Sequence, residues 1–119
     1  MKGYRDLQVW RKAMDLAEMV YVLSRSLPKE EQFRLTSQLL RAVASVPANI
    51  AEGYQRETRK DYAHFISIAR GSLAETETFL LIAARADLLP KAAPEPALAL
   101  ADELSRMLYA LRQSLTSDL

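Results

Sequence analysis

Residues 59–86 read RKDYAHFISIARGSLAETETFLLIAARA and carry the clearest periodic pattern in the chain. Apolar and small residues recur there at steps of three and four, as on the buried side of an α-helix. They form two neighbouring stripes. One stripe contains Tyr62, Ile66, Ala69, Leu73, Thr76, Leu80 and Ala83, and the other contains Phe65, Ile68, Ser72, Phe79 and Ile82. The pattern predicts a long helix with a wide apolar face.

The chain before this helix predicts two more. Residues 7–26 form the first, with Asp6 as its cap, and again contain two apolar stripes. Residues 29–54 form the second, with Pro28 in its first turn, a position where the missing N–H costs nothing. Pro47 lies inside the second helix and predicts a kink near Val43 to Pro47. The stripes of the first helix are Leu7, Trp10, Met14, Ala17 and Tyr21, and beside them Val9, Ala13, Leu16, Val20, Leu23 and Leu27.

Glycine, threonine and proline residues predict where the remaining helices begin and end. Gly53 is predicted to end the second helix or to permit a close approach, and Thr58 is placed to cap the third. Residues 88–96 contain three prolines and form the one substantial loop, followed by a fourth amphipathic helix over residues 97–117. Four helices with short connections predict an all-α fold, an antiparallel up-down-up-down four-helix bundle, with residues 1–119 as a single domain.

Composition places the chain among globular proteins. Half of its residues are apolar, 26% are charged and none is cysteine, which excludes a disulfide framework and a thiolate metal site. No apolar stretch approaches the ~20 residues of a membrane span, and Met1 to Trp10 lack the apolar region of a signal peptide. We therefore expect a cytoplasmic protein with no membrane partner.

Catalytic and metal-binding patterns are sparse. Asp61 and His64 are three residues apart on one helix, but no second acid–histidine pair exists to build a di-iron site. Ser67 lies near the sole histidine without an evident oxyanion donor. Glu75 and Glu77 point to different helix faces, so they are not an acid pair for glycoside chemistry. There is no glycine-rich phosphate loop, and no cofactor is expected.

Two polar groups stand out instead. One follows a single face of the second helix at steps of three and four, and predicts either a hydrogen-bond network around Pro47 or a subunit or ligand contact. The other is basic and is flanked by Tyr54 and Tyr62, an arrangement that suits phosphate contacts and base stacking as well as a solvated turn. The first comprises Gln38, Arg41, Ser45, Asn49 and Glu52, and the second comprises Arg56, Arg59 and Lys60. Together with Arg41, the second group gives the candidate nucleic-acid-binding residues Arg41, Arg56, Arg59 and Lys60.

The net charge of +1 does not by itself predict nucleic-acid binding. Its distribution is uneven. Residues 1–70 hold 12 Lys and Arg against 8 Asp and Glu, whereas residues 71–119 hold 4 against 7. One part of the chain is therefore able to present a basic surface.

Three stretches resemble the four-helix bundle proteins named after the 23S rRNA intervening sequence, which are also labelled S23 ribosomal proteins. They are LQVWRKAMDLAEMVY at Leu7 to Tyr21, LTSQLLRAVASVPANIAEGYQR at Leu35 to Arg56, and the stretch from Tyr62 to Leu80, with NIAEG and GSLAETE as the specific motifs. The sequence departs from the family's pattern at Leu40, where a second arginine often precedes Arg41, and at Arg34, where glycine is common.

The resemblance implies a bundle that assembles into a ring, typically a homopentamer. It also implies a relation to accessory proteins of diversity-generating retroelements, which bind nucleic acid and a reverse transcriptase. The wide apolar arcs of the first and third helices independently favour subunit packing, because an isolated bundle needs only about 3/7 of each helix buried.

The resulting hypothesis is a non-enzymatic, self-assembling scaffold or interaction protein that binds RNA or DNA through repeated basic surfaces. Two alternatives stay open. The chain could be a structural partner of another protein, or a metal-binding bundle enzyme built around Asp61, His64 and Glu75.

Overall fold

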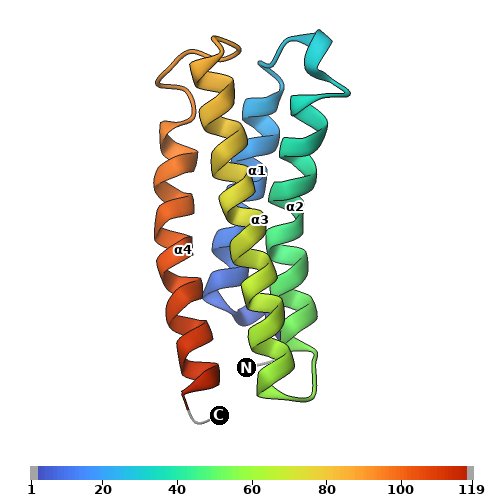
Figure 1. Ribbon diagram of the computed structural model, residues 1–119, viewed down its shortest axis with the longest axis vertical. Coiled ribbons are helices and arrows are strands. Elements are labelled where there is room, and N and C mark those ends of the chain that lie inside the picture. Colours follow the sequence, from blue (N-terminus) through green and yellow to red (C-terminus); the bar gives the residue numbers. More distant parts are fainter. Residues whose placement is uncertain (1–2, 118–119) are drawn as a thin grey trace.

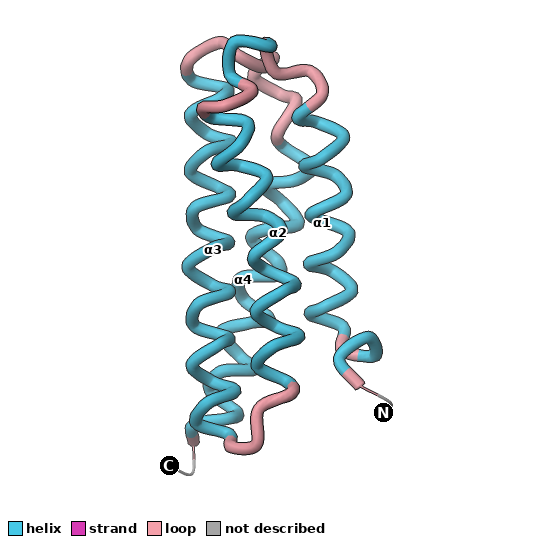
Figure 2. The backbone as a smooth tube through the Cα atoms, turned by 90° about the vertical axis from the view of Figure 1, so that its right-hand side faces the viewer, coloured by secondary structure: helices cyan, strands magenta, loops and turns pink. Residues whose placement is uncertain are grey.

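The structure is a computed structural model that describes residues 3–117. Within them the chain forms an all-α bundle of 46 × 21 × 20 Å whose helices run alternately up and down (Figure 1). Figure 2 shows that the connections gather at the two ends. The helices are α1 (Gln8–Ser24), α2 (Leu35–Tyr54), α3 (Arg59–Arg85) and α4 (Glu95–Thr116), and two short 3-10 helices are η1 (Tyr4–Asp6) and η2 (Lys29–Glu31). The predicted four-helix bundle is confirmed.

The four α-helices occupy the corners of a square. α1 packs against α2 and α4, and α3 packs against the same two helices, so α1 and α3 lie on a diagonal. The contact between α2 and α3 is the most extensive. An ion pair between Lys12 Nζ and Glu103 Oε1, 3.2 Å apart, joins α1 to α4 across the surface.

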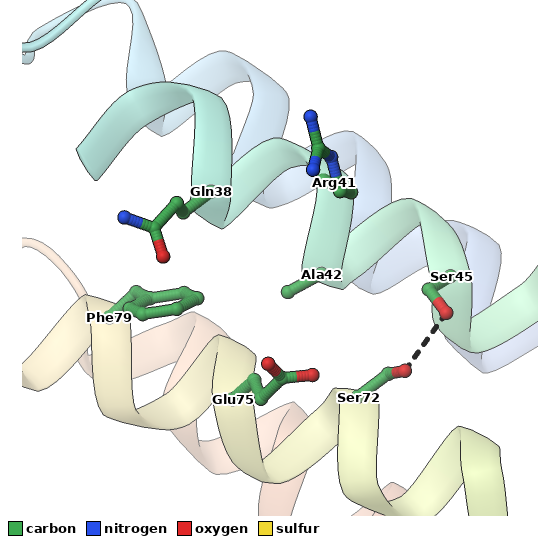
Figure 3. Close-up of a pocket in the computed structure, with 7 residues that line it drawn as sticks. All are labelled: Gln38, Arg41, Ala42, Ser45, Ser72, Glu75 and Phe79. Carbon is green, nitrogen blue, oxygen red and sulfur yellow. Dashed lines mark hydrogen bonds between the residues drawn. The ribbon is translucent and has the colours of Figure 1, made fainter. Parts of the chain in front are cut away.

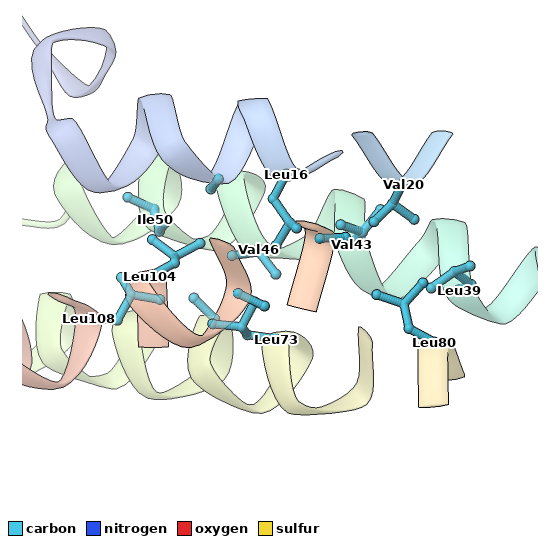
Figure 4. Close-up of a cluster of buried hydrophobic side chains, with 14 of the residues drawn as sticks. Leu16, Val20, Leu39, Val43, Val46, Ile50, Leu73, Leu80, Leu104 and Leu108 are labelled. Carbon is cyan, nitrogen blue, oxygen red and sulfur yellow. The ribbon is translucent and has the colours of Figure 1, made fainter. Parts of the chain in front are cut away.

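One apolar core fills the space between the helices (Figure 4). Its largest members are fully buried branched side chains from all four helices, which pack without polar interruption along most of the bundle. The exception is Thr76, a fully buried hydroxyl that donates 2.8 Å to the Ser72 carbonyl and is thereby satisfied. The fully buried set includes Leu16, Val20, Leu39, Val43, Val46, Ile50, Ile66, Leu73, Leu80, Leu104 and Leu108.

The two stripes predicted for the first helix contribute unequally to this core, because Leu7, Trp10 and Ala17 of one stripe only pack against its edge. Val9, Ala13, Leu16 and Val20 are buried, whereas Met14 and Tyr21 of the other stripe are 44% and 47% exposed. The apolar arc of α1 is therefore wider than the packing within one chain uses.

The predicted cap of the first helix and the predicted start of the second are wrong, and α4 begins at Glu95, two residues before its predicted start. Asp6 does not cap α1, because it lies in η1 and its carboxylate pairs with Arg11 instead, while Leu7 occupies the N-cap position without a side-chain bond. Pro28 does not begin α2 either. The residues after it form η2, and Arg34 then leaves the helical region with φ −120° and ψ −110°, so that α2 begins at Leu35, the first side chain there that reaches the core.

The ends of α3 are closed by two different caps. Thr58 accepts from the Asp61 N–H at 3.0 Å, which confirms the predicted N-cap. At the other end Asp87 adopts a left-handed conformation with φ 60°, Leu88 N–H donates to the Ala83 carbonyl at 2.8 Å, and Asp87 N–H donates to the Ala84 carbonyl at 3.2 Å. These are the bonds of a Schellman motif, in which glycine is the usual residue at the left-handed position.

Gly53 is a close-approach site rather than a helix terminator. It is buried inside α2, and a Cβ atom on it would lie 2.8 Å from the Phe65 Cβ of α3 and 3.2 Å from the Tyr62 carbonyl oxygen. Gly71, in the middle of α3, does not serve the same purpose. It is exposed, and a Cβ there would meet nothing within 4 Å.

Pro47 does not interrupt α2, which continues as an α-helix on both sides of it. The ring is buried against the neighbouring helices, and its missing N–H leaves the Val43 carbonyl without the usual donor four residues on. The kink predicted at this point stays a prediction.

Candidate functional site

A short polar network joins α2 to α3. Ser45 Oγ and Ser72 Oγ are 2.9 Å apart, and Asn49 Nδ2 donates to both Ser45 Oγ and the Ser45 carbonyl at 2.8 Å. The network thus contains two of the five residues of the predicted polar face, and it adds Ser72, which the sequence assigned to an apolar stripe. Glu52 is not part of it, because its carboxylate pairs with Arg56 at 3.4 Å.

Gln38 and Arg41 line a cleft of about 250 Å³ that opens beside this network, between α2 and α3. Figure 3 shows the Gln38 amide above the Phe79 ring and the Glu75 carboxylate between Phe79 and Ser72, whereas the Arg41 guanidinium points away from Glu75. Within residues 3–117 no ion pair joins Arg41 or Glu75 to another residue. The polar face of α2 is therefore divided into a bonded part around Asn49 and an open part around Arg41.

The four predicted basic residues do not form one patch. Arg41 lies fifteen residues before Arg56, which corresponds to about 22 Å along a helix axis. Arg56 stacks on Phe65, with 4.7 Å from its Cζ to the ring centre, and Arg59 Nη2 donates to the Ser114 carbonyl of α4 at 2.6 Å. Lys60 is exposed beside them. Only the three residues near the junction of α2 and α3 are brought together.

The two tyrosines at this junction pack on each other. Their rings meet edge to face with centres 6.0 Å apart, and Tyr62 is half-buried. Burial, and then the neighbouring Tyr54, raise the pKa of Tyr62 above its ordinary value. The tyrosine pair therefore stabilises the α2–α3 contact and offers less open ring surface than the sequence suggested.

The residues considered as catalytic or metal-binding candidates all lie on α3, at exposed or hydrogen-bonded positions. His64 is exposed and its ring contacts Phe65, and Ser67 Oγ accepts a hydrogen bond from Arg112 Nε at 2.6 Å. Asp61 and Glu75 are exposed on the same helix. In the part of the chain that the structure describes, no group of three or more His, Asp and Glu side chains could hold a metal ion.

An apolar groove of about 410 Å³ runs between α1 and α2. The second stripe of α1 forms one wall, with Trp10, Met14 and Ala17, and small residues of α2 form the other. Tyr4 of η1 closes the lower end, where its ring meets Trp10 edge to face at 5.3 Å. The wall on α2 consists of Ala44, Pro47, Ala48 and Ala51.

The seam between α3 and α4 holds residues that the sequence analysis missed. Arg112 reaches Ser67 across the seam, and the Arg70 guanidinium lies over the Tyr109 ring with 5.1 Å from Cζ to its centre. Farther along, burial and then the Asp102 carboxylate raise the pKa of Glu77 above its ordinary value. In the sequence, the one sign of this seam was Arg70, a charged residue between the apolar stripes of the third helix.

The described helices include none long and apolar enough to cross a membrane. A sequence model of the 23S rRNA-intervening sequence protein family matches residues 5–110. The chain belongs to this family. Its fold is similar to the crystal structure of a protein with unknown function from the S23 ribosomal protein family of Bacteroides thetaiotaomicron, with a TM-score of 0.82 and 25% sequence identity over 88% of this chain and 98% of that chain. A comparison with curated proteins finds no match.

Membership of the 23S rRNA-intervening sequence family confirms the resemblance carried by NIAEG and GSLAETE. The structure places both motifs along the contact between α2 and α3, at different levels of it. NIAEG contributes Asn49 and the close-approach Gly53, and GSLAETE contributes Ser72, the partner of Ser45. In this chain both motifs therefore form the α2–α3 contact.

Proposed function

We propose that this chain is a non-enzymatic scaffold that assembles with further copies of itself, as a ring of five according to the family resemblance. The observation that carries the proposal is the exposed part of the second apolar stripe of α1. Met14 lines the apolar groove that α1 forms with α2 and is 44% exposed, and Tyr21 of the same stripe is 47% exposed two turns farther along α1. Contiguous exposed apolar surface with a concave centre is typical of protein–protein interfaces.

A second exposed apolar set lies on the diagonal helix. Ile68 and Ile82 of α3 are 38% and 45% exposed, and α3 lies diagonally across the bundle from α1. Two unlike surfaces on opposite corners favour a head-to-tail contact, which closes into a ring when the rotation between copies allows it. The wide arcs of α1 and α3 support self-assembly for this reason.

Light scattering tests the assembly. Wild-type protein is expected to have the mass of several chains, and Met14→Glu is expected to have the mass of one, because a carboxylate buried at the contact loses its hydration without gaining a partner. Ala99→Glu adds the same charge at an exposed position of α4 and should leave the assembly intact. A wild-type monomer at micromolar concentration contradicts the proposal.

Contact with RNA or DNA is the second candidate function. It is favoured by the exposed Arg56 and Lys60 at the junction of α2 and α3, beside the Phe65 ring. A ring would repeat this weak site and raise affinity through multivalency. The same scattering experiment with a mixed RNA and DNA pool tests it, since bound nucleic acid should be released as salt rises. If the mass of the assembly does not change when RNA and DNA are added, the result favours the alternative that the chain binds another protein.

A further inference from the structure

Two arginines lie at neighbouring levels of the α3–α4 seam. Arg70 belongs to α3 and Arg112 to α4, and the two helices are antiparallel neighbours (Figure 1). Arg112 Nε donates to Ser67 Oγ at 2.6 Å, and Ser67 lies one turn from Arg70. Arg70 in turn lies over Tyr109, which is one turn from Arg112. The four residues therefore fall within about 5 Å along the bundle axis.

Neither arginine has a carboxylate partner. Within residues 3–117 the described ion pairs include neither of them. The acidic residues of the same seam lie farther along it. Glu77 is seven residues from Arg70, about 10 Å, and Asp102 is ten residues from Arg112, about 15 Å, and pairs with Arg106. This part of the seam thus combines two half-buried positive charges that repel each other and that nothing nearby neutralises.

Arg70 also has an unsatisfied donor. Its Nε atom is buried and donates to no acceptor in the described structure. Buried N–H groups almost always have a partner, and a buried donor without one disfavours the fold. Ser67 adds a second donor, because a hydroxyl that accepts from Arg112 still has its own hydrogen to give.

We propose that Arg70 and Arg112 bind a phosphate group at this seam. Guanidinium groups match phosphate through paired N–H donors, and a tetrahedral phosphate has enough oxygens to receive both arginines and the Ser67 hydroxyl at once. The Tyr109 ring is 51% exposed beside the site, where it can pack against the group that carries the phosphate. The proposal does not depend on self-assembly or on Arg56 and Lys60.

Titration of the purified protein with inorganic phosphate, at constant ionic strength, tests the site. The arginine Nε–H signals of Arg70 and Arg112 are expected to shift in NMR spectra. Arg112→Gln should weaken phosphate binding by about tenfold or more, because it removes charge-assisted hydrogen bonds. Arg112→Lys keeps the charge but loses the planar fork, and should also bind more weakly than wild type.

Arg106→Gln is the matched control. It removes the same charge from the same helix, but its guanidinium pairs with Asp102 outside the proposed site, so phosphate binding should not change. Arg70→Gln is the second test variant, and circular dichroism shows whether it folds. If it does not fold, Arg112→Gln alone decides.

A short oligothymidylate in a parallel titration distinguishes the source of the phosphate. Binding of free phosphate identifies a small phosphorylated ligand or the ion, and binding of the oligonucleotide alone identifies a phosphodiester backbone, provided that Arg112→Gln abolishes it. The proposal is overturned if neither probe binds, if Arg112→Gln binds as well as wild type, or if oligonucleotide binding depends on Lys60 and not on Arg112.

Discussion

Leu73→Ala is expected to lower the free energy of unfolding by about 2–5 kcal/mol. Leu73 lies at the middle of α3, is 1% exposed, and packs in the core between all four helices (Figure 4). Its truncation removes apolar contacts and leaves a cavity, because the helices on either side are fixed by their other contacts and close over the gap only in part.

Urea unfolding followed by circular dichroism measures this change, with every variant at the same protein concentration so that assembly contributes equally. Leu81→Ala on the same helix is the control. Leu81 is 48% exposed, so its free energy of unfolding should change by no more than about 0.5 kcal/mol. Equal losses for the two leucines would show that α3 does not face the core as described.

Gly53→Ala is expected to destabilise the fold by about 1–3 kcal/mol, despite the higher helix propensity of alanine. The new Cβ would lie 2.8 Å from Phe65 Cβ, which is fixed directly to the α3 backbone and cannot rotate away. Accommodating the methyl group requires α2 and α3 to separate, and this weakens the most extensive helix–helix contact of the bundle.

Gly71→Ala is expected to have the opposite effect on stability, although Gly71 follows Ile-Ala-Arg much as Gly53 follows Ile-Ala-Glu. Nothing lies within 4 Å of its Cβ position, and the site is exposed in the interior of α3. Alanine should therefore stabilise the protein by about 0.5–1 kcal/mol. The same denaturation experiment compares the pair, and stabilisation by both substitutions would refute the tight contact at Gly53.

The sequence predicts well what depends on local chemistry. Thr58 caps α3 because the bond it accepts comes from a residue three positions away. The predicted loop over residues 88–96 is correct up to Pro94, but α4 begins at Glu95, because Pro96 fits the first turn of a helix. The prediction of where α2 starts is wrong because that position depends on packing as well as on local chemistry. Pro28 and the acidic residues after it also suit a short 3-10 turn, and only the burial of Leu35 against the other helices selects the true start.

What depends on packing between helices could not be predicted. Either stripe of α1 satisfies a helical period, and only the positions of α2 and α4 decide that Leu16 is buried and Met14 is exposed. The Ser45–Ser72 bond and the Arg112–Ser67 bond each join residues far apart in sequence, at a helix register that no local rule specifies. The Schellman cap was missed because aspartate, not glycine, occupies its left-handed position.

The square arrangement of the helices also bears on how quickly the chain folds. Three of its four helix–helix contacts join helices that are consecutive in sequence, and only the α1–α4 contact joins the two ends of the helical region. Contacts between consecutive helices close short loops and lose little chain entropy, which is typical of domains that fold in microseconds to milliseconds. We therefore expect α2 and α3 to form the nucleus and the docking of α4 onto α1 to come late.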